Sequence, residues 1–212
     1  MKFTVATFTT LATTASAFNT FGAKKTAAPK VPAFNVDNIP GALEPVGLFD
    51  PLGFAAKADE KTLKRYREAE LTHGRVAMLA TVGFLVGEKV EGSSFLFDSS
   101  ISGPAISHLT QVPPGFWALL LIGIGAAEQK RAEIGWVDPK DVKFDQPGLL
   151  RDDYIPGNLG FDPLGLKPSD PAEFELMQTK ELQNGRLAML AAAGFMAQEL
   201  ADGKGIIEHF TS

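Results

Sequence analysis

One nine-residue segment occurs twice in this chain, and the two copies constrain what the chain can fold into. The first copy covers residues 70–78 and the second covers residues 181–189, 111 residues later. A second segment, Phe-Asp-Pro-Leu-Gly, occupies 49–53 and recurs at 161–165, 112 residues later. Two different segments that repeat at nearly one offset indicate a duplicated unit. Because there are only two copies, we expect two halves related by pseudo-twofold symmetry.

Each copy has the pattern of a turn followed by a long helix. Asp-Pro-Leu-Gly suits a type I turn, in which Pro presets φ and Gly closes the turn. Residues 170–173, Asp-Pro-Ala-Glu, are typical of an N-cap, a first-turn proline and a capping-box glutamate. We therefore expect helices over residues 59–91 and 171–202. A third helix is expected over residues 115–133, directly after two prolines.

The hydropathy pattern makes membrane insertion depend on charged residues. Uncharged runs cover residues 76–87, 109–127 and 187–198, whereas a membrane span needs about 20 apolar residues. The outer helices are long enough only if a Glu and an Arg of each repeat copy enter the apolar zone. Each such charge alone costs about 2.5–3.5 kcal/mol. The helices therefore form a soluble bundle, or their charges are neutralised in the membrane.

Helix geometry favours neutralisation between two crossed helices. Glu and Arg five residues apart lie about 140° apart around one helix, which makes a poor pair within it. If the two halves cross, Glu70 can meet Arg186 and Glu181 can meet Arg75. A glycine four residues after each Glu lets the two backbones approach closely. We expect an all-α membrane protein with three transmembrane helices, of which the first and third cross.

The N-terminal segment predicts a targeting signal, and the basic residues predict the orientation of the chain in the membrane. Residues 1–33 contain no acid, and Ala15-Ser16-Ala17 is typical of a cleavage site. We interpret residues 1–33 as a bipartite plastid-targeting presequence and residues 34–212 as the three-helix domain. Lys and Arg precede the first helix and follow the second, whereas residues 92–111 have neither. This bias places the N-terminus on the stromal side of a plastid membrane.

The composition excludes several classes of function. The chain has no Cys, so it has neither disulfides nor thiolate chemistry. Its net charge of −5, without a dominant basic face, argues against nucleic acid as a partner. Nothing in the sequence resembles a Ser-His-Asp arrangement, a P-loop or a zinc-protease motif. We therefore do not expect an enzyme.

The repeated segments resemble those of the light-harvesting chlorophyll-binding family. The resemblance rests on the doubled Glu-x-x-(His/Asn)-Gly-Arg-x-Ala-Met segment and covers residues 44–202. Residues 156–165 and the presequence are most similar to the fucoxanthin chlorophyll a/c-binding branch. The resemblance implies a thylakoid antenna that binds chlorophyll a, chlorophyll c and fucoxanthin, with diadinoxanthin as a further candidate. It implies thylakoid lipids, other antenna subunits and a photosystem core as partners.

The resemblance also implies which side chains ligate chlorophyll magnesium. A carboxylate paired with an arginine is a net-neutral oxygen ligand, which suits a magnesium site in lipid. The implied ligands are Glu70, His73, Glu128, Glu181, Asn184, Gln198 and His209, and the charge partners are Arg75, Arg131 and Arg186. Each has a structural alternative, as an ion pair, a satisfied polar group or a solvated side chain. Asp50 and Asp162 are candidates for binding the polar ends of carotenoids, with turn formation alone as the alternative.

Two alternatives to light harvesting stay open at this point. A photoprotective member of the same family would dissipate excitation, with lumenal acids such as Glu91, Asp98, Asp202 and Glu208 sensing acidification. A small membrane transporter built on the repeat is a remote alternative, because three short spans enclose no obvious path. Quenching of fluorescence at low pH would favour the first, and solute uptake by pigment-free vesicles would favour the second.

Overall fold

The computed structural model describes residues 40–43, 47–93, 100–142 and 148–211, and all of them belong to one unit of the chain. The predicted presequence and Asp98 lie outside the described residues. Within the described residues the secondary structure is helical, with two isolated β-bridges and no strand. The prediction of an all-α chain is confirmed for this part.

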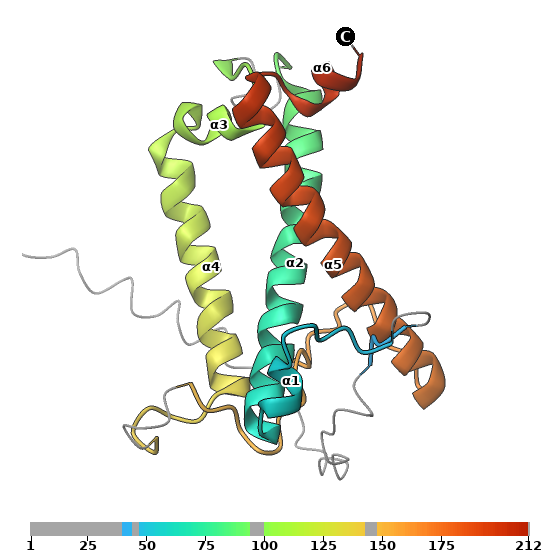
Figure 1. Cartoon of the computed structure of the whole chain (residues 1–212). Helices are drawn as coiled ribbons and strands as arrows, with labels where there is room; N and C mark the ends of the chain where they lie inside the picture. Colours follow the sequence, from blue (N-terminus) through green and yellow to red (C-terminus); the bar gives the residue numbers. More distant parts are fainter. Residues whose placement is uncertain (1–39, 44–46, 94–99, 143–147, 212) are drawn as a thin grey trace, which may run out of the picture. The chain divides into compact units, whose positions relative to one another are not determined.

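Six helices occupy the described residues (Figure 1). They are α1 (Phe54–Lys57), α2 (Glu60–Val90), α3 (Ala105–Gln111), α4 (Pro114–Gly135), α5 (Pro171–Asp202) and α6 (Ile206–Thr211). The bounds of α2, α4 and α5 lie within two residues of the three predicted ranges. The sequence patterns do not predict α1, α3 and α6, because such short helices contain too few turns to show a hydrophobic period.

Aspartate side chains cap the two longest helices at their N-termini. The carboxylate of Asp59 accepts a hydrogen bond from the backbone N–H of Thr62, and that of Asp170 accepts one from Glu173. The first of these caps begins α2 and the second begins α5. Gly203, with φ of 65°, ends α5 in the left-handed conformation that glycine adopts without strain. The predicted cap at Asp170 is confirmed.

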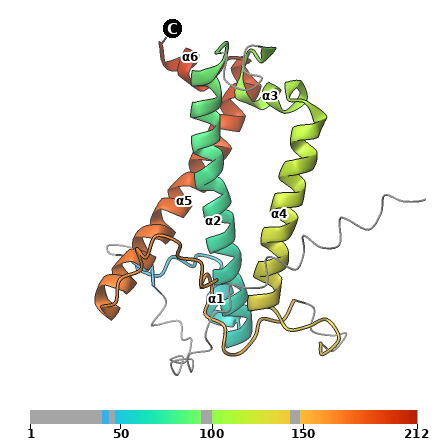
Figure 2. The ribbon, with the colours of Figure 1, turned by 180° about the vertical axis from the view of Figure 1, so that it is seen from behind.

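α2 and α5 cross and pack through a seam of small residues (Figures 1 and 2). Gly74 and Ala77 of α2 are buried, as are Gly185, Ala188 and Ala192 of α5. A Cβ atom added to Gly74 would lie 3.0 Å from the Cα atom of Gly185, and the reverse holds at the same distance. The two backbones therefore touch where the repeated segments meet, as small residues at a helix interface allow.

Large apolar side chains cover the outer surfaces of α2, α4 and α5. Leu79, Leu119 and Leu190 are 76%, 73% and 75% exposed, one on each helix. Apolar surface of this extent indicates a contact with lipid, ligand or partner. By length and hydropathy no single described helix meets the requirement for a membrane span, while α3 and α4 meet it together, at 104° to each other.

At the ends of α2 and α5 opposite the Asp-Pro-Leu-Gly turns, each of the two helices supplies a glutamate that caps a short helix. Glu88 of α2 accepts hydrogen bonds from the N–H groups of Ile206 and Ile207, each at 2.7 Å, and so caps α6. Glu199 of α5 accepts one from Ile106 at 2.7 Å and so caps α3. Glu199 is 2% exposed and interacts with Glu88. Its Oε1 atom has no hydrogen-bond partner among the described residues.

We predict that Gly185→Leu weakens the packing of α2 on α5. The new side chain would meet the backbone of Gly74 rather than a movable side-chain tip, so the free energy of unfolding should fall by at least about 1–3 kcal/mol. Thermal loss of helical circular dichroism in detergent measures the effect. Gly194→Leu is the matched control on α5, because no atom lies within 4 Å of its added Cβ. Equal melting of the two variants would contradict the tight crossing.

Candidate functional site

Two reciprocal ion pairs join α2 and α5 beside the glycine contact. The Nε atom of Arg186 lies 2.7 Å from Oε1 of Glu70, and the Nε atom of Arg75 lies 2.7 Å from Oε1 of Glu181. The four side chains are 27% to 39% exposed, so all are half-buried. The structure therefore contains both contacts that the repeat predicts, and each half supplies one acid and one base to the other.

Each of these arginines also binds a glycine in the loop before an Asp-Pro-Leu-Gly turn. Arg186 donates from Nη1 to the carbonyl of Gly41 at 2.8 Å, and Arg75 donates from Nη2 to the carbonyl of Gly157 at 3.0 Å. Both glycines have positive φ, 98° and 81°. A side chain at either position would collide with a leucine of the long helix. Glycine is therefore needed at both positions for the loop to reach the arginine.

A third repeated segment signals these loop contacts, which the repeats at residues 49–53 and 70–78 do not predict. Ile-Pro-Gly-x-Leu occurs at residues 39–43 and again at 155–159. Its offset of 116 residues differs from those of the other two repeats. The loop lengths of the two halves therefore differ, although the glycine reaches the equivalent arginine in both. A search that allowed loop insertions would have found it.

His73 and Asn184 each use one atom to bind the preceding turn of their own helix. His73 Nδ1 lies 2.7 Å from the carbonyl of Ala69, and Asn184 Nδ2 donates to the carbonyl of Lys180 at 2.8 Å. Because a carbonyl oxygen only accepts hydrogen bonds, the imidazole proton of His73 must lie on Nδ1. Both bonds use the donor of the side chain and leave its acceptor, Nε2 or Oδ1, for another partner. In metal sites, a hydrogen bond of this kind typically orients the imidazole that ligates the metal.

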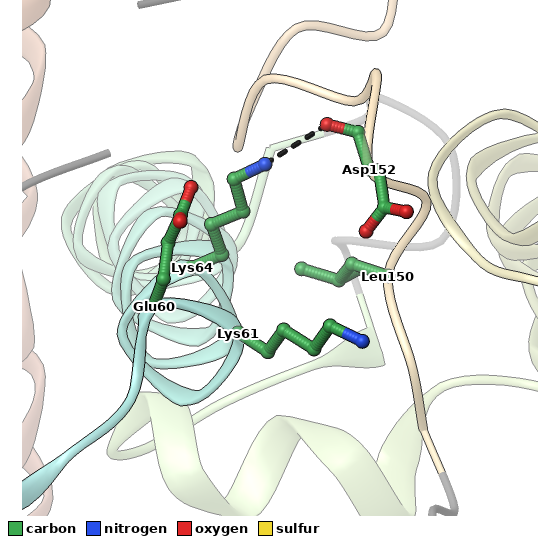
Figure 3. A pocket seen from close by; sticks show the side chains of 5 residues that line it. All are labelled: Glu60, Lys61, Lys64, Leu150 and Asp152. Carbon is green, nitrogen blue, oxygen red and sulfur yellow. Dashed lines mark hydrogen bonds between the residues drawn. The ribbon is translucent and has the colours of Figure 1, made fainter. Parts of the chain in front are cut away.

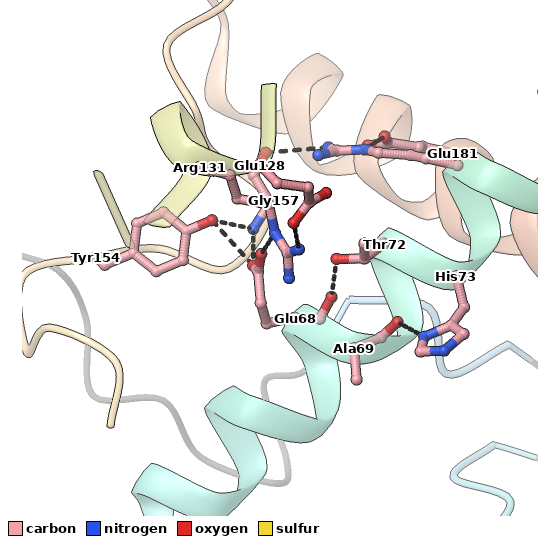
Figure 4. A network of polar contacts seen from close by, with 10 residues as sticks. Glu68, Ala69, Thr72, His73, Glu128, Arg131, Tyr154, Gly157 and Glu181 are labelled. Atoms are coloured by element: carbon pink, nitrogen blue, oxygen red, sulfur yellow. Dashed lines mark hydrogen bonds and ion pairs between the residues drawn. The ribbon is translucent and has the colours of Figure 1, made fainter. Parts of the chain in front are cut away.

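Arg131 of α4 binds two acids rather than one. Its Nη1 atom lies 2.6 Å from Oε2 of Glu128, which is the predicted pair within the helix. Its Nε atom lies 3.0 Å from Oε1 of Glu68 on α2, a contact that the sequence did not predict. Figure 4 shows Arg131 between the two carboxylates. The Glu128 side chain is 55% exposed and that of Glu68 is 4% exposed. Glu128 is therefore the more accessible of the two acids to a ligand.

Arg67 makes the first ion pair different from the second. Its Nη1 atom lies 3.0 Å from Oε2 of Glu70, so Glu70 binds two arginines. Gln178 stands at the equivalent position of the second half, and among the described residues Glu181 binds one arginine where Glu70 binds two. A cavity of about 390 Å³ lies beside Glu70, with both of its arginines in the lining.

Gln198 and His209, predicted as separate ligands, lie together at the end of α5. Both side chains bind Asp202, His209 through Nδ1 at 3.0 Å and Gln198 through Nε2. Gln198 Nε2 also lies 3.4 Å from the His209 ring. The sequence did not predict this proximity, because the two residues lie 11 positions apart. They meet because the turn at Gly203 brings α6 back toward α5.

Asp50 and Asp162 use their carboxylates to close the repeated turns. Asp50 accepts hydrogen bonds from the N–H groups of Phe54 and Ala55 at 2.9 and 2.8 Å. Asp162 accepts them from Lys167 and Leu166, both at 3.0 Å. These contacts support the turn-forming alternative, and a role at the ends of carotenoids stays a prediction.

A second cavity, of about 230 Å³, lies near the start of α2, and none of the predicted ligands lines it (Figure 3). Glu60, Lys61, Lys64 and Asp152 line it together with Leu150. The Nζ atom of Lys64 donates to the carbonyl of Asp152 at 3.0 Å, which ties the loop to α2. The mixed charges of the lining favour no single class of ligand.

Acid should weaken the second turn through Asp162. The N–H of Lys167, followed by that of Leu166, lowers the pKa of Asp162 below its ordinary value of 3.8. A carboxylate with a lowered pKa stabilises the fold above its unfolded-state pKa, and this contribution is lost as the pH falls through the folded-state value. The melting temperatures of the wild type and Asp162→Asn should therefore converge below about pH 4. A difference that stays constant with pH would contradict the assignment.

Comparisons with known proteins agree with this geometry. Residues 36–200 match the family described as chlorophyll A-B binding protein. The chain is 55% identical over 175 residues to light-harvesting complex stress-related protein 3.2, chloroplastic, of Chlamydomonas reinhardtii, covering 81% of this chain and 66% of the relative. It is 52% identical over 185 residues to the fucoxanthin-chlorophyll a-c binding protein, chloroplastic, of Isochrysis galbana, covering 84% and 86%.

A plant relative, chlorophyll a-b binding protein 7, chloroplastic, of Solanum lycopersicum, is 33% identical over 174 residues, covering 76% of this chain and 60% of the relative. The chain thus spans less than two thirds of the length of the stress-related relative. These relatives are chloroplast light-harvesting and pigment-binding proteins rather than enzymes, as the sequence predicted. The chain belongs to the chlorophyll a/b-binding protein family, whose fold is a helical membrane fold.

Proposed function

We propose that the protein is a light-harvesting antenna that binds chlorophyll a, chlorophyll c and fucoxanthin and passes excitation to a photosystem. One observation carries this proposal. Each of the two reciprocal Glu–Arg contacts is followed, three residues later, by a side chain that keeps an acceptor atom for another partner. The 52% identity to a fucoxanthin-chlorophyll a-c binding protein supports this choice of pigments.

The chemistry of these side chains suits chlorophyll. Magnesium accepts oxygen ligands and also imidazole nitrogen. Arg75 contacts one oxygen of Glu181, while Arg186 and Arg67 contact one oxygen each of Glu70. Each carboxylate oxygen has two lone pairs, so acceptor positions remain on both side chains. The same residues therefore hold the helices together and offer ligand atoms. When bound, chlorophyll supplies the absorption of light, and the residues of the chain set the spacing of the pigments.

The remaining ligands extend the proposal beyond the crossing. Glu128 offers an exposed carboxylate on α4, and Gln198 and His209 offer an amide and an imidazole at the end of α5. We propose diadinoxanthin as a further carotenoid. The polar ends of carotenoids would meet the backbone near the turns of Asp50 and Asp162, because both carboxylates already bind N–H groups.

The proposed setting is the thylakoid membrane, with α2, α4 and α5 as spans and the N-terminus in the stroma. The ion pairs support this, because paired charges cost less to insert than single ones. The exposed leucines of all three helices would face lipid and pigment. We propose other antenna subunits and a photosystem core as partners, since excitation must leave the protein to be used.

Purification in mild detergent tests the proposed function. We expect an absorption spectrum with bands of chlorophyll a, chlorophyll c and a xanthophyll, and their absence would reject the proposal. Glu181→Ala should lose one chlorophyll and about 1–3 kcal/mol of stability, because it leaves Arg75 unpaired. Glu175→Ala is the matched control, since Glu175 is exposed on the same helix. Full pigment content in the Glu181 variant would contradict ligation by this residue.

Dissipation of excitation is a second candidate function. The observation that favours it is the 55% identity to a light-harvesting complex stress-related protein. The contact of Glu199 with Glu88 offers a device for it, because Glu199 is buried and the two carboxyl groups accept the backbone hydrogen bonds that cap α3 and α6. Protonation would weaken the caps that they provide to α3 and α6, on the side proposed to face the lumen.

Fluorescence lifetimes of the pigmented protein distinguish dissipation from harvesting. If the protein dissipates, the lifetime should shorten as the pH falls from neutral, because protonation of Glu199 would weaken the cap that it provides to α3. Glu199→Gln should remove most of this response. Glu208→Gln tests an exposed acid at the same end of the protein, which the sequence suggested as a sensor, and it should leave the response intact if Glu199 is the sensor. A lifetime that does not change with pH would leave harvesting as the function.

A further inference from the structure

Glu68 is an enclosed acid on α2 to which the proposed function gives no role. It is 3% exposed. It precedes Glu70 by two residues and therefore points about 200° away around the helix. Its contacts are consequently not with α5 but with α4 and with the loop before the second Asp-Pro-Leu-Gly turn. A charge this well enclosed requires compensation from every side.

Three donors from two separate parts of the chain supply that compensation. Arg131 donates from Nε to Oε1 of Glu68 at 3.0 Å. The Tyr154 hydroxyl and the backbone N–H of Gly157 donate to Oε2 at 2.9 and 2.8 Å. Burial, and after it the charge of Glu68, raises the pKa of Tyr154, so its hydroxyl remains a donor. Both oxygens of Glu68 are thus bound.

The same donors lead directly to two of the proposed pigment ligands (Figure 4). The other end of the Arg131 guanidinium binds Glu128 at 2.6 Å. The carbonyl of Gly157 accepts from Arg75 at 3.0 Å, and Arg75 binds Glu181 at 2.7 Å. Glu68 therefore stands between the two arginines, in direct contact with one and separated from the other by a single residue.

The charges around Arg131 explain why a second acid is useful there. Arg131 alone could turn both arms of its guanidinium toward Glu128 and occupy both carboxylate oxygens. Glu68 holds Nε, so only Nη1 reaches Glu128. The second oxygen of Glu128, an exposed side chain, then stays open to a ligand.

The duplicated half of the chain has no equivalent of this residue. The offset that relates Glu70 to Glu181 relates Glu68 to Thr179. α4 likewise occurs once among the described helices. Glu68 on α2 binds Arg131 of α4, whereas Thr179 stands at the equivalent position of α5, which links the acid to α4 rather than to the crossing.

We propose that Glu68 is a positioning residue that orients Arg131 and, through Gly157, Arg75, and thereby sets the ligand geometry of both Glu128 and Glu181. The inference rests on the proposed pigment-binding function. It assigns no pigment to Glu68 itself. Residues that orient a metal ligand from behind typically change the affinity of the site by about 10- to 100-fold when they are replaced.

The test compares Glu68→Gln with Glu128→Ala in the full chain purified with its pigments. Glu68→Gln keeps the shape and removes the charge that holds Arg131. We expect its absorption difference spectrum to contain the band lost in Glu128→Ala, and its visible circular dichroism to change further through the Glu181 pigment. A variant that carries both Glu68→Gln and Glu128→Ala should lose no more of this absorption band than Glu128→Ala alone. Glu175→Gln, an exposed change of the same type on α5, should alter neither spectrum.

Tyr154→Phe provides a milder variant in case Glu68→Gln does not fold. It removes one donor to Glu68 and leaves Arg131 in place, so the Glu128 pigment should dissociate at a lower temperature than in the wild type. Normal spectra and normal pigment retention in both variants would overturn the positioning role. The role would also be overturned if the absorption lost in the double variant equalled the sum of the losses in the Glu68 and Glu128 single variants. A wild-type protein without chlorophyll would instead overturn the proposed function itself.

Discussion

A charged side chain enclosed in an apolar setting is stable only when an opposite charge is held against it. At the crossing of α2 and α5, two glutamates and two arginines meet this requirement at 2.7 Å, and each pair takes one member from each half. The glycine contact beside them brings the backbones close enough for the side chains to reach. The loops follow from the same contacts, because each arginine also binds a glycine carbonyl of one loop. The crossing, the loops and the proposed ligand atoms thus depend on one set of charges.

The repeat is the reason that much of this arrangement could be predicted. The repeat predicts the partner of each charged residue. Glu70 cannot pair well with the arginine of its own copy, so its partner is the equivalent arginine of the other copy, Arg186. The helix bounds follow from caps and turns that the local sequence encodes. Glu68 could not be predicted in the same way, because it has no counterpart in the second copy and its partners come from distant segments. Glu88 and Glu199 are related by the offset of 111 residues, but the repeat does not reveal their partners, which are backbone groups of α6 and α3.

The two halves are alike in scaffold and unlike in charge. Glu70 binds a second arginine, Arg67, whereas Gln178 stands at that position in the other half. Glu68 binds α4, whereas Thr179 replaces it in the second copy. Pigments held at equivalent positions would therefore lie in different electrostatic fields. In an antenna such a difference separates the energies of otherwise identical chromophores, which gives excitation a direction in which to move.

The exchanged caps at the far ends of α2 and α5 bear on how the chain is assembled. Glu88 serves amides 118 and 119 positions further along, and Glu199 serves one 93 positions back. None of these bonds can form while the C-terminal part is still being synthesised. Closure of such distant contacts is slow compared with helix formation. The helices of the nascent polypeptide can therefore form before these caps do, and the end of the structure that carries α3 and α6 is completed late.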